Sequence, residues 1–129
     1  MLKRVLDSSV LIPFWNNRHL SDRAEREVVA AADELAKTYQ SNVILTPIFI
    51  EFVVGARNAN ELRLMHLFLA RFIILDEGNI LAEDWRQARR IAERVPPDGK
   101  RRQLGDCLIW AIAQRLKYDV QALDVRFKG

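Results

Sequence analysis

Short apolar runs alternate along this chain with longer segments in which apolar residues recur every three or four positions. The short runs lie at residues 5–6, 43–45, 72–75 and 120–122, and each predicts a buried strand. The longer segments between them predict amphipathic helices. Strands separated by helices of ten or more residues need crossover connections, which favour parallel pairing. The pattern therefore predicts a three-layer α/β/α fold with a mainly parallel sheet.

Polar residues and prolines mark where several of these helices are expected to begin. Ser21 is expected to cap one helix, and Thr46 is expected to cap another that has Pro47 as its first residue. Four acids follow the third predicted strand: Asp76, Glu77, Glu83 and Asp84. We interpret these four as first-turn acids of the next helix, where the helix dipole favours negative charge. The alternative for Asp76 is a place at the border of a functional site.

The composition bounds the class of protein without naming its chemistry. A chain of 129 residues of which 50% are hydrophobic suits one globular domain, which we expect to span residues 1–129. No apolar run has the length of a membrane span, and the N-terminus does not read as a signal peptide. The single cysteine, Cys107, excludes an intrachain disulfide and favours a reducing compartment such as the cytoplasm. A net charge of +3 permits a polyanionic partner but does not require one.

Asp7 follows the first apolar run directly and precedes two hydroxyl residues, Ser8 and Ser9. One interpretation is that Asp7 caps a short helix beginning near Ser9, because Asp is an ordinary N-cap residue. The other is that Asp7 is a functional acid, since ligands of open α/β sheets bind beyond the carboxyl ends of the strands. Its own surroundings do not decide between the two.

Three further acids share this setting. Asp124 follows the last predicted strand, Glu51 lies about one turn into the helix after the second strand, and Asp106 opens a helix. The carboxyl ends of parallel strands lie at one rim of a sheet, so all four acids are expected to meet there. Two carboxylates about 4 Å apart repel by roughly 4 kcal/mol at an effective dielectric constant near 20, so such a set favours a bound cation.

Oxygen ligands in this number suit Mg²⁺ or Mn²⁺, whereas structural zinc prefers cysteine and histidine. The chain has one cysteine and two histidines, far apart in sequence, so zinc is disfavoured. A carboxylate-held Mg²⁺ can activate water toward a phosphodiester and shield the charge of the transition state. Three cations just before Asp106 are candidates for RNA phosphate contacts: Lys100, Arg101 and Arg102.

Four segments carry a family resemblance: VLDSSVLI at 5–12, TPIFIEFVVGAR at 46–57, LGDCLIWAIA at 104–113 and ALDVRF at 122–127. In order and spacing they resemble the PIN-domain ribonucleases, and most of all the VapC-type toxins of toxin–antitoxin pairs. The resemblance implies a Rossmann-like parallel sheet of four to five strands and an endoribonuclease that uses Mg²⁺ or Mn²⁺. It also implies a homodimer neutralised by a small VapB-like antitoxin.

Carried over by residue, the resemblance makes Asp7, Glu51 and Asp106 metal-binding acids, with Asp124 a fourth and more variable one. Ser9 stands where the family has a small polar residue that supports the metal or its water. Ala122 is a departure, because the family usually has a hydroxyl residue there.

Two alternative functions belong to other classes of protein. A phosphoacceptor receiver domain fits poorly, because Asp7 is followed by serines and no lysine closely follows the last two strands. A catalytically silent RNA-binding or scaffold protein stays open.

Overall fold

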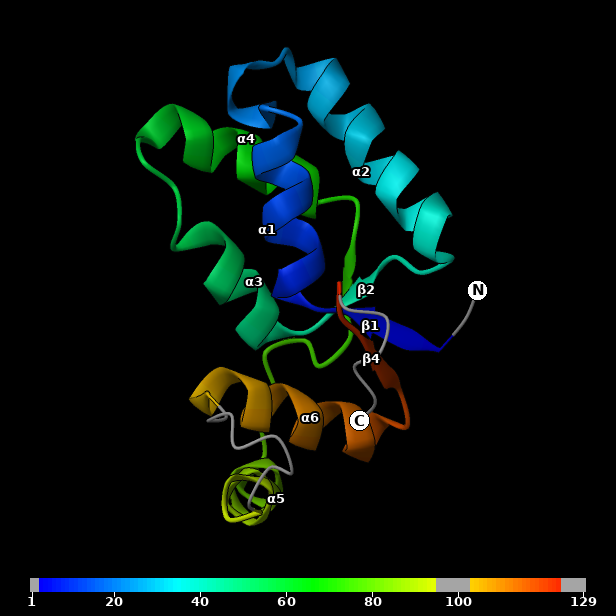
Figure 1. Cartoon of the computed structure of the whole chain (residues 1–129), viewed down its shortest axis with the longest axis vertical. Helices are drawn as coiled ribbons and strands as arrows, with labels where there is room; N and C mark the ends of the chain where they lie inside the picture. Colours follow the sequence, from blue (N-terminus) through cyan, green and yellow to red (C-terminus); the bar gives the residue numbers. More distant parts are fainter. Residues whose placement is uncertain (1–2, 95–102, 124–129) are drawn as a thin grey trace.

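The structure is a computed structural model that describes residues 3–94 and 103–123. Its strands are β1 (Arg4–Leu6), β2 (Val43–Ile44), β3 (Ile73–Ile74) and β4 (Asp119–Gln121). Its α-helices are α1 (Ser8–Asn17), α2 (Glu25–Tyr39), α3 (Thr46–Val53), α4 (Ala59–Leu69), α5 (Ala82–Ala92) and α6 (Leu104–Leu116). A 3-10 turn, η1 (Leu20–Asp22), precedes α2. Strands and helices alternate in the order that the sequence predicts for an α/β fold (Figure 1).

The strands form two parallel pairs. β1 pairs with β4, with Val5 opposite Val120, and β2 pairs with β3, with Val43 opposite Ile73. β1 lies beside β2, and the buried hydroxyl of Ser41 joins the two by donating to the Arg4 carbonyl at 2.5 Å. Within the described residues the sheets have two strands each. Parallel pairing is thus confirmed, whereas a continuous sheet of four to five strands is not.

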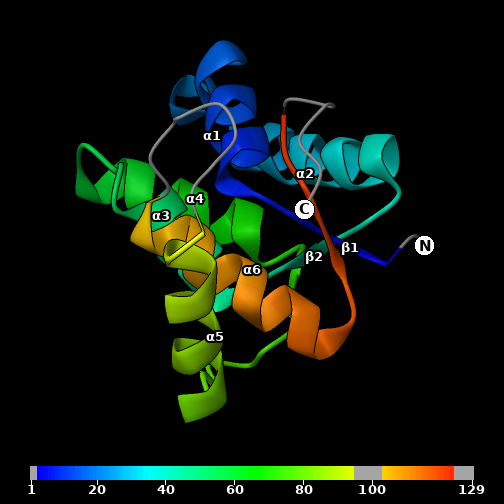
Figure 2. The same ribbon diagram turned by 60° about the horizontal axis from the view of Figure 1, so that its bottom comes forward.

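Helices cover both sides of the strands. α1, α2 and α4 lie on one side and α5 and α6 on the other, in both views (Figures 1 and 2). The core on the first side is built around aromatic rings. Trp15 meets Phe52 and Phe68 edge-on, each at 5.5 Å between ring centroids, and Phe52 stacks on Phe68 at 5.6 Å. These three side chains are almost fully buried, so they fix α1, α3 and α4 against one another.

Several element starts differ from the predicted ones. Ser21 does not cap a helix: it lies in η1, and its hydroxyl accepts a hydrogen bond from Arg57 at 3.0 Å, while α2 begins at Glu25. α3 begins at Thr46 itself, with Leu45 in the N-cap position. Within the described residues no helix is both long and apolar enough to cross a membrane.

The acids after β3 divide into two kinds. The first-turn prediction is confirmed for Glu83 and Asp84, which lie in the first turn of α5. It is wrong for Asp76 and Glu77, which stand in the turn that follows β3, well before α5 begins. A tight turn there puts Glu77 at a positive φ of 51°.

Candidate active site

Asp7 stands where β1 ends and α1 begins. Its carboxylate accepts a hydrogen bond from the Ser9 amide at 3.2 Å, so it is the N-cap of α1. Its own amide donates to the Gln121 carbonyl at 2.9 Å, which fixes Asp7 at the carboxyl end of the β1–β4 pair. The cap interpretation is therefore confirmed. Because the cap places a half-buried carboxylate at the strand edge, it is compatible with a functional role.

Glu51 reaches the same edge from α3. Its neighbour Phe52 is 1% exposed and anchors the helix in the core, while the Glu51 side chain is half-buried. The Ser8 hydroxyl donates to Glu51 Oε1 at 2.9 Å, although the two residues are 43 positions apart. The first residue of α1 thereby orients an acid of α3.

Gly105 meets the other oxygen of the same carboxylate. A Cβ placed on Gly105 would lie 2.5 Å from Glu51 Oε2 and 3.3 Å from Glu51 Cδ. Since real Cβ atoms do not approach other atoms so closely, only glycine leaves room for Glu51 in this position. The first turn of α6 therefore packs directly against the Glu51 carboxylate, and Asp106 is the next residue of that turn.

The charges of Asp7, Glu51 and Asp106 act on one another. Burial raises the pKa of Glu51, the charges of Asp7 and Asp106 raise it further, and the Ser8 hydrogen bond opposes the rise. The pKa of Asp106 is also raised, by burial and then by the charge of Asp7, against a hydrogen bond from the Gln103 backbone. The structure thus brings three of the four predicted acids within electrostatic reach of each other.

The remaining predicted site residues either lie outside the described residues or have other partners. Asp124, Lys100, Arg101 and Arg102 lie outside the described residues, so their roles stay predictions. Ser9 has a different hydrogen-bond partner from Ser8. Its hydroxyl accepts a hydrogen bond from the Leu123 amide at 3.2 Å, which ties α1 to the residue before Asp124.

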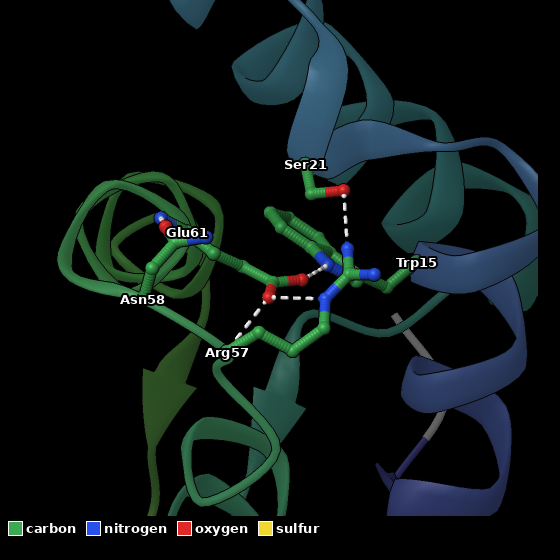
Figure 3. Close-up of polar contacts among 5 residues, drawn as sticks. All are labelled: Trp15, Ser21, Arg57, Asn58 and Glu61. Atoms are coloured by element: carbon green, nitrogen blue, oxygen red, sulfur yellow. Dashed lines mark hydrogen bonds and ion pairs between the residues drawn. The ribbon is translucent and has the colours of Figure 1, made fainter.

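Two other acids of the chain are buried in a different way. Glu61, 3% exposed, accepts hydrogen bonds from Trp15 Nε1 at 2.9 Å and from the Arg57 amide and Nε at 2.9 and 3.1 Å (Figure 3). Burial raises the pKa of Glu61, but these hydrogen bonds outweigh burial and the net pKa is lowered. Asp84 is fully buried and is held by Arg115 at 2.7 and 2.9 Å, and its pKa is lowered against the effect of burial in the same way.

This contrast separates two kinds of acid in the described residues. Glu61 and Asp84 each have a cationic partner that stabilises the ionised form. Within the described part of the chain, Asp7, Glu51 and Asp106 form no ion pair, and Asp7 raises the pKa values of the other two. The pKa values of Glu51 and Asp106 are raised, and perturbed carboxylates at a strand edge mark a candidate functional site.

The donor chemistry of this cluster fits a hard divalent cation. Carboxylate oxygens suit Mg²⁺ and Mn²⁺, and the nearby Cys107 is buried in the core, away from a soft-metal role. As they stand in the described ranges, 3–94 and 103–123, no three His, Cys, Asp or Glu side chains converge closely enough to form a complete ligand set. The carboxylates of Asp7, Glu51 and Asp106 are therefore groups of the right chemical kind for such a cation.

Two residues that contact Glu51, Ser8 and Gly105, were not among the predicted site residues. A glycine in a helix is less favourable than alanine by up to about 1 kcal/mol, so Gly105 carried a local signal of close approach. No local signal marks Ser8, because its partner lies 43 residues away.

Comparison with known proteins adds one finding. The family model of the PIN domain matches residues 4–129, nearly the whole chain. No curated protein and no solved structure matches the chain.

Proposed function

Because the chain belongs to the PIN domain family, we propose that it is an endoribonuclease that hydrolyses RNA phosphodiester bonds with a carboxylate-bound Mg²⁺ or Mn²⁺. The observation that carries the proposal is the meeting of Asp7, Glu51 and Asp106 from three separate segments, without a cationic partner in the described residues. Asp124 is the proposed fourth acid, and Lys100, Arg101 and Arg102 are the proposed phosphate contacts.

The chain's own groups have distinct parts in this reaction. Asp7 is fixed by its cap on α1, and Glu51 is oriented by the Ser8 hydroxyl, so two of the three proposed ligands are held before a metal binds. A bound divalent cation supplies the charge that activates water and shields the phosphodiester in its transition state. The raised pKa values of Glu51 and Asp106 mean that protons compete with the cation for these oxygens.

For the biological role, we propose the toxin of a VapBC-type pair acting in the cytoplasm. The support is family membership together with the VapC-like motifs at both ends of the chain. The proposed partners are a second copy of the chain and a small VapB-like antitoxin. Co-expression with the product of a neighbouring small reading frame tests this role: growth arrest by the chain alone, relieved by the neighbour, is the expected result.

The activity is tested with end-labelled structured RNA in the presence of Mg²⁺, Mn²⁺ or EDTA. Asp7→Asn is the informative variant, because Asn caps a helix as well as Asp does and the fold should survive. Asp33→Asn is the control: it removes an exposed carboxylate that pairs with Arg71 on the helical surface, where an ion pair contributes little.

We expect metal-dependent cutting by the wild type and by Asp33→Asn, and background cutting by Asp7→Asn. Cutting that survives both EDTA and Asp7→Asn would overturn the metal-site proposal. RNA binding without cutting in any metal would favour the alternative, a catalytically silent PIN-like RNA-binding or scaffold protein.

A further inference from the structure

Asp76 is a buried acid to which the proposed reaction gives no part. It follows β3, is 4% exposed, and accepts a hydrogen bond at Oδ1 from the Thr46 amide at 2.9 Å. Its other oxygen, Oδ2, is buried and has no hydrogen-bond partner. A carboxylate is costly to bury in this way, so its place in the fold needs a reason.

The reason lies at the start of α3. The N-cap residue of this helix is Leu45, whose side chain cannot accept a hydrogen bond, and Pro47 follows within the first turn. Asp76 supplies the missing acceptor from the turn that follows β3, 30 residues further along the chain. Its negative charge also lies at the positive end of the α3 dipole. α3 is therefore capped by tertiary structure and not by its own sequence.

α3 is a short helix that must hold Glu51 in a narrowly defined position. It has eight residues and carries Glu51 against Gly105, where a Cβ would already lie 2.5 Å from the carboxylate. Small shifts of the helix along or about its axis would move Glu51 out of this position. The core contact of Phe52 with Trp15 holds the middle of α3, and the Asp76–Thr46 bond holds its beginning.

Asp76 is also coupled to α6, the helix that carries Asp106. The pKa of Arg115 on α6 is raised first by its hydrogen bond with Asp84, and the charges of Glu83 and Asp76 add to the rise. The Arg115 guanidinium also donates to the Asn79 carbonyl at 3.2 Å, in the turn that follows Asp76. Asp76 therefore lies near enough to the carboxyl-terminal part of α6 for its charge to act on Arg115.

We infer that Asp76 is a positioning residue for the acid cluster: by capping α3 through the Thr46 amide, it fixes Glu51 relative to Asp7 and Asp106. The inference rests on the proposed function for the role of Glu51, but the capping itself is measurable without activity.

The test compares Asp76→Ala with Asp76→Asn and with a control, Asn58→Ala. Alanine removes the acceptor, whereas asparagine keeps an acceptor for the Thr46 amide. Asn58 caps α4 by accepting from the Glu61 amide at 2.8 Å, so Asn58→Ala removes a cap from a helix that carries no proposed metal ligand. The readouts are amide hydrogen exchange in α3, Mn²⁺ affinity by calorimetry, and the thermal midpoint.

In Asp76→Ala we expect amides of the first turn of α3 to exchange roughly tenfold faster, as the loss of a cap implies. We expect Mn²⁺ affinity to fall by roughly tenfold, a usual size for loss of a group that orients a metal ligand. Asp76→Asn should restore both values, even if its thermal midpoint stays low. Asn58→Ala should lower the thermal midpoint and leave Mn²⁺ affinity at the wild-type value.

Equal loss of Mn²⁺ affinity in Asp76→Ala and Asn58→Ala would overturn the inference, because it would show a general effect of stability. If Asp76→Ala does not fold, exchange in the wild type decides: the Thr46 amide must be protected like the interior of α3, and rapid exchange would overturn the capping. Failure of the proposed function looks different, since the wild type itself would then bind no Mn²⁺ while the α3 exchange pattern still followed the cap.

Discussion

Gly105→Ala is the most direct probe of the acid cluster. The new Cβ would lie 2.5 Å from Glu51 Oε2, and an ordinary contact begins at 3.4 Å, so the carboxylate must move by at least 0.9 Å, the difference between the two. The atom in the way is the free end of a flexible side chain and not backbone, so the movement is cheap in free energy. It also strains the 2.9 Å hydrogen bond from Ser8 to the other oxygen of the same carboxylate.

The effects on stability and on activity should therefore have opposite directions. Alanine in place of glycine stabilises a helix by up to about 1 kcal/mol, so the thermal midpoint should stay unchanged or rise by about 4 °C. Misplacement of a reacting group by about 1 Å can cost roughly 100-fold in rate, so RNA cleavage should fall by about that factor. A variant that is at least as stable as the wild type and yet inactive would locate the function at Glu51.

The matched control is Gly55→Ala, four residues after Glu51. A Cβ on Gly55 would meet only the Phe52 carbonyl, at an ordinary 3.5 Å, so this variant should keep both stability and cleavage. The assays are thermal unfolding, Mn²⁺ titration and cleavage of labelled RNA. Wild-type cleavage and Mn²⁺ affinity in Gly105→Ala would refute the reasoning. Unfolding of Gly105→Ala would also refute it, because it would show that the Glu51 side chain cannot move aside at low cost.

Three further predictions follow from the same contacts. Ser8→Ala removes the hydrogen bond that favours ionised Glu51, so the acidic limb of the cleavage-against-pH profile should move to higher pH, whereas Ser21→Ala should leave it in place. Because the pKa of Glu51 is raised in the folded state, the metal-free protein should lose stability as pH rises above 4.5, the usual pKa of glutamate. In urea titrations Glu51→Gln should not show this loss, and a stability difference between variant and wild type that does not grow with pH would contradict the prediction. Glu61→Ala leaves the Trp15 and Arg57 donors without their acceptor, so the free energy of unfolding should fall by roughly 3 kcal/mol, and a fall below about 1 kcal/mol would show that water replaces the carboxylate.

Much of the fold follows from local pattern. The four strands lie within a residue or two of their predicted positions, because a short apolar run between two helical segments leaves few positions where a strand can form. Asp7 and Glu51 come together because each follows the carboxyl end of a parallel strand, whereas Asp106 joins them on α6, which follows α5 and packs its first turn against Glu51. The fourth, Asp124, stays a prediction.

The sequence could not show which polar group partners which. Ser21 has the local signature of an N-cap, yet its hydroxyl serves Arg57, which is 36 residues away. Thr46 resembles a self-sufficient helix start, yet its amide is capped by Asp76. In both cases a tertiary partner competes with the local one, and the choice depends on packing that a one-dimensional pattern does not contain.

Burial next to each acid explains how the chain tolerates the cluster. Leu6 precedes Asp7, Phe52 follows Glu51 and Cys107 follows Asp106, and these three neighbours are 0%, 1% and 3% exposed. Full burial of a leucine or phenylalanine contributes about 1.5–3 kcal/mol. This contribution offsets repulsion among the three carboxylates. Apolar anchors can therefore hold three like charges together without a metal, and the repulsion they retain would be released when a divalent cation binds. Metal affinity and the stability of the metal-free protein then depend on the same carboxylate repulsion. A substitution that relieves this repulsion should raise the metal-free stability and lower the metal affinity.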